Sequence, residues 1–168
     1  MNDAQVFAEA AVMGAVAGMR AMSAPAVVSK FSDAGLIPED GSPIAWLQHP
    51  AVGTALKVLA TGELVADKLP FVPARTQAGP LAGRALSGGI GGAAIFTATK
   101  RPWWMGALIG AAAAVGASFG AYKLRKWVTE EQHIPNTVVG LVEDAVAAGF
   151  VYVVMSSLKA HSQDGARA

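Results

Sequence analysis

The sequence predicts an all-α protein, a polytopic transmembrane helix bundle of about five spans, within a range of about four to six. Three observations predict this fold class. Hydrophobic residues make up 53% of the 168 residues and charged residues only 15%, whereas an average soluble domain is about 25% charged. The mean hydropathy is +0.41, although a soluble chain this short would need polar residues to cover its surface. Apolar segments of near-membrane length recur, with polar, Pro- and Gly-containing stretches between them.

Five segments approach the roughly 20 apolar residues that cross a bilayer core of about 30 Å. Pro25 predicts a bend or an end in the first segment, because proline lacks a backbone donor and clashes with the preceding turn. The third segment is rich in Gly and Ala. The fourth is uncharged and has aromatic residues at both ends, as the water–lipid boundary favours. In chain order the segments are 6–28, 51–69, 81–99, 103–122 and 137–158.

Polar breaks separate these segments. The stretch 32–50 is predicted to be a loop with a short interfacial turn at 44–47, and a second loop is expected around 70–80. The run Lys100-Arg101-Pro102 predicts a tight third connection. The charged stretch after the fourth segment is interpreted as a solvated loop, and it contains Lys123, Arg125, Lys126, Glu130 and Glu131.

Glycines spaced four residues apart predict close packing, because membrane helices associate through small residues that let their backbones approach. The pairs are Gly14/Gly18, Gly106/Gly110 and Gly116/Gly120. They also raise the prospect of a homo-oligomer.

The chain is predicted to form a single transmembrane domain, 1–168, with two diverged halves at 1–72 and 78–160. The stretch around Arg20 resembles the stretch around Arg84, and Leu64-Val65-Ala66-Asp67 resembles Leu141-Val142-Glu143-Asp144. Duplicated halves are common in transporters. A five-span order would, however, run the two arginine helices in the same direction and the two acidic helices in opposite directions.

Charged residues inside the predicted spans are the candidate site residues. A charge at the centre of a membrane helix costs roughly 2.5–3.5 kcal/mol on insertion scales, so such residues are expected to face the bundle interior or water and to pair. They are the expected pathway for an ion or small polar solute. The candidates are Arg20, Lys57, Glu63, Asp67, Arg84, Glu143 and Asp144.

Spacing predicts how these charges pair. Glu63 and Asp67 are four residues apart and share one helix face, so they are expected to pair with Arg84. Arg20 is expected to pair with Asp144 or with Glu143, through the parallel hydrogen bonds that arginine makes with carboxylates. Lys57 lies on another face and is expected to snorkel or to line a polar path.

Two functions stay open at this point. The first is a small transporter or channel for an ion or small polar solute. The second is a non-catalytic membrane scaffold or accessory subunit with structural charge pairs. An enzyme is not expected: the chain has no cysteine, its three histidines lack paired ligand spacing, and no nucleophile-elbow serine is present. No metal, cofactor or nucleic-acid partner is predicted, since the net charge is only +1.

Four motifs resemble one known family. They are Gly18-Met19-Arg20-Ala21-Met22-Ser23-Ala24-Pro25, Gly62-Glu63-Leu64-Val65-Ala66-Asp67-Lys68-Leu69-Pro70, Pro80-Leu81-Ala82-Gly83-Arg84 and Leu141-Val142-Glu143-Asp144. Together they resemble the bacterial membrane family catalogued as domain of unknown function 4126, over nearly the whole chain. The resemblance implies a small, multi-pass inner-membrane protein and implies no particular activity.

Overall fold

The computed structural model describes residues 1–21, 23–33, 44–66, 77–130 and 135–167. These residues form helices and short connections without a strand, which confirms the all-α prediction. The elements are α1 (Asp3–Met19), α2 (Ser23–Asp33), the short 3-10 helix η1 (Ala45–Gln48), α3 (Pro50–Ala66), α4 (Ala78–Ala98), α5 (Trp103–Glu130) and α6 (Asn136–Arg167).

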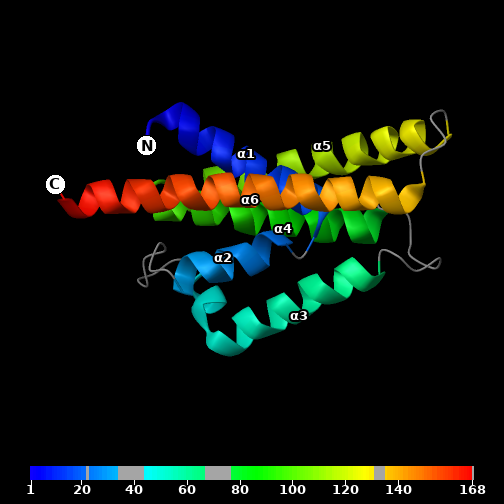
Figure 1. Cartoon of the computed structure of the whole chain (residues 1–168). Coiled ribbons are helices and arrows are strands. Elements are labelled where there is room, and N and C mark those ends of the chain that lie inside the picture. The colour runs from blue at the N-terminus through cyan, green and yellow to red at the C-terminus, as the bar shows by residue number, and fades with distance from the viewer. Residues whose placement is uncertain (22, 34–43, 67–76, 131–134, 168) are drawn as a thin grey trace.

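Helices α1, α4 and α5 form the tightly packed centre of the molecule (Figure 1). Glycines line the contact of α1 with α5 and the contact of α4 with α5. A Cβ atom added at any of them would lie under 3.0 Å from a backbone carbonyl of the neighbouring helix, so no larger residue fits without a backbone shift. These glycines are Gly14 and Gly18 on α1, Gly88 and Gly92 on α4, and Gly106 and Gly110 on α5.

The same spacing at Gly116 and Gly120 makes no such contact. Within the described part of the chain, no heavy atom of a neighbouring element lies within 4 Å of a Cβ built on either residue. Both residues are exposed, because α5 presents Gly110, Ala114 and Ser118 to the bundle and turns the other side of the helix outward. The predicted packing role of Gly116 and Gly120 is therefore wrong within this chain.

The first predicted span is not one continuous helix. Helix α1 ends at Met19, Arg20 is extended (φ −137°, ψ 99°), and α2 begins at Ser23. The chain reverses at this point, since α2 runs back along α4 with Ala24 beside Gly91 (Figure 1). The break comes before Pro25 because proline has no N–H to donate to the carbonyl of Ala21, its partner in a continuous helix.

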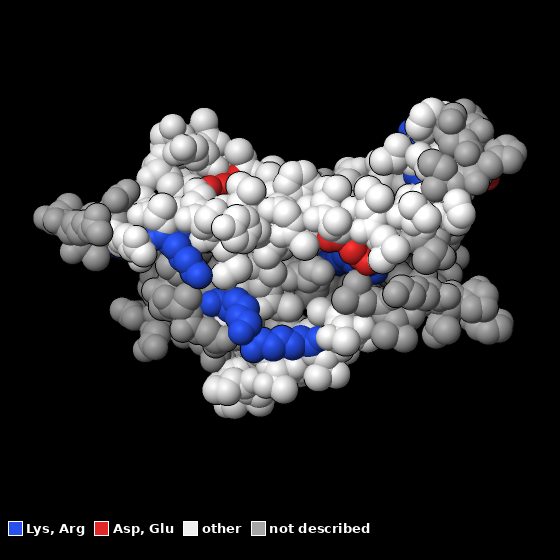
Figure 2. All heavy atoms as spheres, viewed as in Figure 1, with Lys and Arg blue, Asp and Glu red and all other residues white. Residues whose placement is uncertain are grey.

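Helices α5 and α6 are each long and apolar enough to cross a membrane. They do not resemble the core helices of a soluble protein, because large apolar side chains point outward along both, with Leu108 65% and Tyr152 74% exposed. Uncharged side chains make up most of the face shown in Figure 2. Such surface is characteristic of contact with lipid or another apolar partner. Of the five predicted spans, these two meet the length and hydropathy expected of a crossing, so the predicted number is not confirmed.

Helix α6 lies along the bundle in the opposite direction to α1 (Figure 1). The amino group of Met1 lies 2.9 Å from Nδ1 of His161, so the start of α1 and the end of α6 meet at one end of the molecule. Helices α2 and α3 and the η1 turn pack together as a side layer that reaches the centre through α2.

The α4–α5 corner is the tight connection that the sequence predicts. Lys100 has a positive φ of 56°, and the N–H of Arg101 donates to the carbonyl of Phe96 at 2.8 Å. This closure is a Schellman motif, in which glycine is the usual residue at the left-handed position.

Candidate functional site

A polar cluster surrounds the reversal between α1 and α2. In a continuous helix, the carbonyls of Gly18 and Met19 would accept hydrogen bonds from the fourth residue on. Here Nη1 of Arg84, from α4, donates to both, at 2.5 Å and 3.1 Å. One buried guanidinium thus replaces the hydrogen bonds that the end of α1 has lost.

Two serines complete this replacement. Ser87 Oγ, one turn after Arg84, donates to the carbonyl of Ala21. Ser118 Oγ of α5 lies 3.1 Å from the carbonyl of Gly18 and 2.8 Å from that of Ala114 in its own helix. Backbone carbonyls left without partners are costly in lipid or in a protein core. The reversal is therefore stabilised by side chains from two other helices.

Arg20 stands at the reversal and forms an ion pair with Asp144 of α6. Arg20 is buried, at 4% exposed, whereas the side chain of Asp144 retains 25% exposure. The pair joins the break in the first segment to the sixth helix and matches the first of the two partners predicted for Arg20.

Glu143 pairs with a residue that sequence reasoning placed in a solvated loop. Arg125 Nη2 lies 2.5 Å from Glu143 Oε2, and both side chains are largely buried. The loop interpretation is wrong for Lys123 to Glu130, because α5 continues to Glu130, one and a half turns beyond Arg125; Glu131 lies outside the described residues. Trp127, an aromatic residue inside the charged stretch, is a signal in the sequence that the helix continues there.

The remaining candidates are not brought into this cluster by the described residues. Lys57 is exposed on α3, which packs against α2 and η1. The Glu63 side chain and all of Asp67 lie outside the described part of the chain, so their pairing with Arg84 stays a prediction.

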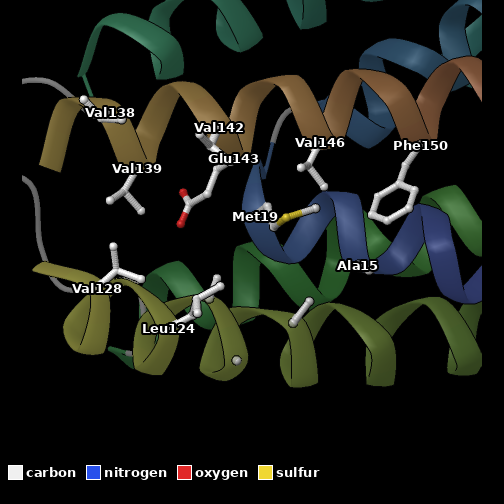
Figure 3. A pocket seen from close by; sticks show the side chains of 13 residues that line it. Ala15, Met19, Leu124, Val128, Val138, Val139, Val142, Glu143, Val146 and Phe150 are labelled. Atoms are coloured by element: carbon white, nitrogen blue, oxygen red, sulfur yellow. The ribbon is translucent and has the colours of Figure 1, made fainter. Parts of the chain in front are cut away.

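An apolar groove of about 430 Å³ separates the second half of α5 from the first half of α6, with the end of α1 as its floor (Figure 3). Glu143 points into the space between the two helices (Figure 3), where it meets Arg125. Most of the lining is aliphatic or aromatic, and includes Met19, Leu124, Val128, Val139, Val142 and Phe150.

Comparison with known protein families gives a match over most of the chain. Residues 8–157 match the family described as domain of unknown function 4126. The chain belongs to this family. The matched range covers the reversal, both ion pairs and the glycine contacts, so the fold and polar cluster lie inside the family domain. No curated protein and no solved structure matches the chain.

The chemistry available at the cluster is that of charge pairing and hydrogen bonding. Across the described ranges, no three His, Asp or Glu side chains are grouped closely enough to hold a metal ion. What the arrangement does is connect the reversal between α1 and α2 to α4, α5 and α6.

Proposed function

We propose that this protein is a multi-pass integral protein of the inner membrane that acts without catalysis, as a scaffold or accessory subunit. Its intramembrane charges hold the helices together. The observation that carries this proposal is the Arg20–Asp144 pair, which fastens α6 to a break in the first apolar segment.

Burial supports the structural role. A route for ions or polar solutes needs ionisable groups that water can reach. Arg20 and Arg84 are instead 4% and 5% exposed, and each is engaged by other parts of the chain. Hydrogen bonds from Arg84, Ser87 and Ser118 to backbone carbonyls serve the reversal itself.

A second candidate is transport of an ion or small polar solute, and one observation favours it. The Asp144 side chain is a quarter exposed and stands beside an interrupted helix. Interrupted helices with adjacent ionisable groups form the substrate sites of many transporters.

One paired experiment separates these functions. Asp144→Asn and its control Asp3→Asn are purified in detergent for thermal unfolding, and reconstituted in liposomes for proton and potassium flux with ion-sensitive dyes. Asp3 is the control because its pair with Arg101, at 2.5 Å, has a carboxylate that is 83% exposed. The structural role predicts that Asp144→Asn lowers the free energy of unfolding by about 3–5 kcal/mol, since the buried guanidinium of Arg20 loses its carboxylate partner on α6.

The control, the double variant and the flux measurement each have an expected result. Asp3→Asn is expected to change stability by less than about 1 kcal/mol. The double variant Arg20→Gln/Asp144→Asn is expected to recover part of the loss, because the buried charge that lost its partner on α6 is itself removed. Flux in the unmodified protein that Asp144→Asn abolishes, with stability unchanged, would favour transport and contradict the structural proposal.

A further inference from the structure

The groove between α5 and α6 has a polar end. Arg125 and Glu143 bridge the two helices at its wall. On the other side of that bridge, α5 forms a polar hollow of about 450 Å³ lined by Tyr122, Arg125, Lys126, Thr129 and Glu130. The apolar groove therefore adjoins a hollow that contains two cations, two hydroxyl groups and one carboxylate.

Aromatic residues near both ends of α5 show where the groove and the hollow lie along the helix. Trp103 and Trp104 begin the helix, and Tyr122 and Trp127 stand near its end, as in the aromatic belts of membrane helices. The hollow is level with the second belt. From there the groove runs along α6 from Val138 to Phe150, a distance of about 18 Å at 1.5 Å per residue.

Arg125 has unused hydrogen-bonding capacity. One of its terminal nitrogens binds Glu143, while its Nε–H is buried and has no hydrogen-bond partner within the described part of the chain. The planar guanidinium suits a phosphate, which accepts two parallel hydrogen bonds. Lys126 is exposed and 3.9 Å from Glu130, a loose pair that leaves the ammonium accessible.

We propose that this is a binding site for one phospholipid of the surrounding bilayer. An acyl chain lies in the groove between Leu124, Val142 and Phe150, and the phosphate is bound by Arg125 and Lys126. Each of the two carboxylates nearby is paired with a cation: Glu143 with Arg125, and Glu130, which lines the same hollow, with Lys126. The inference rests on the membrane location in the proposed function, and it adds a ligand that the scaffold role does not require.

Native mass spectrometry of delipidated protein in detergent, titrated with phosphatidylglycerol, tests the site. Val146→Trp places a large side chain in the groove, and Val153→Trp is its control, on the same helix but outside the lining. Val146→Trp is expected to weaken binding of the first lipid at least about tenfold, since each buried methylene contributes about 0.8 kcal/mol. Val153→Trp is expected to leave this binding unchanged.

A second pair of variants tests the phosphate contact. Lys126→Gln is expected to weaken binding about fivefold, the effect of one basic residue near a lipid headgroup. Lys123→Gln removes the same charge from the same helix but lies outside the hollow, so it is expected to have little effect.

Three results would overturn the proposal. The first is equal lipid binding by Val146→Trp and Val153→Trp. The second is displacement of the lipid by inorganic phosphate, which would show a phosphate site without an acyl groove. The third is a dimer that Val146→Trp dissociates, which would show that a second copy fills the groove. A protein that is soluble without detergent would instead refute the membrane location, so the two failures are distinguishable.

Discussion

Helix α5 meets α4 and α6 through interfaces of different chemistry. Toward α4, Gly106 and Gly110 face Gly92 and Gly88, and the backbones touch. Toward α6, the helices stand apart across an apolar groove, and the Arg125–Glu143 pair bridges them. Lipid tails are as apolar as leucine, so apolar side chains alone give membrane helices little reason to associate. Contact therefore depends on small residues in one interface and on charge in the other.

The largest effect is expected where the backbones touch. Gly110→Leu would force a side chain into space that cannot hold even a Cβ, so folded protein should fail to accumulate. Gly110→Ala, with a smaller intrusion, should lower the free energy of unfolding by about 1–3 kcal/mol. Thermal unfolding in detergent measures this change.

Gly116→Leu is the matched control, on the same helix but with no described residue of another element within 4 Å of its Cβ position. It should fold and accumulate normally. Equal loss from Gly110→Leu and Gly116→Leu would show that the contacts of α5 with α1 and α4 do not dominate stability.

A smaller effect is expected at the α6 interface. Glu143→Gln keeps an acceptor for Arg125 but removes the opposite charge, so it should lower the free energy of unfolding by about 1–2 kcal/mol. Glu130→Gln, in an exposed pair with Lys126, should change it by less than about 0.5 kcal/mol. Similar melting temperatures for the two variants would mean that the Arg125–Glu143 pair does not fasten α6.

The smallest effect is expected at the α4–α5 corner, and it should be favourable. Lys100→Gly relieves a left-handed backbone conformation (φ 56°) that glycine adopts without penalty, and should stabilise the protein by about 0.5–1 kcal/mol. A lower melting temperature for this variant would contradict the assigned turn.

Local signals predicted a large part of this fold. The start of α5 at Trp103, the tight corner at Lys100 and the spacing of Gly106 and Gly110 each depend on neighbouring residues, so each was visible in the sequence. The cost of burying charge also predicted that Arg20 pairs with Asp144 or Glu143, and the partner is Asp144, 124 positions away in the numbering.

The reversal at Arg20 was less accessible to sequence reasoning. Pro25 indicates that the helix breaks, but the direction of the chain afterwards depends on hydrogen bonds from Arg84, Ser87 and Ser118. No periodicity in 6–28 encodes those distant partners. Arg125 was missed for a similar reason: its charged neighbours are typical of a loop, and its partner Glu143 lies on another helix.

The reversal also bears on the predicted duplication. Gly18 lies beside Arg84 and Met13 beside Gly91, so α1 and α4, the helices of the two arginine elements, run in opposite directions. Helices α3 and α6, of the two acidic elements, are also opposed (Figure 1). An inverted repeat requires both pairs to be opposed, which the five-span order did not allow. The halves 1–72 and 78–160 stay a prediction.

The proposals on charge pairs and lipid all require that α5 and α6 lie in a bilayer. Cell fractionation followed by an alkaline carbonate wash tests this most directly. The protein should stay in the membrane pellet after the wash and enter solution only with detergent. Recovery as a monodisperse, detergent-free protein in the soluble fraction would contradict the account.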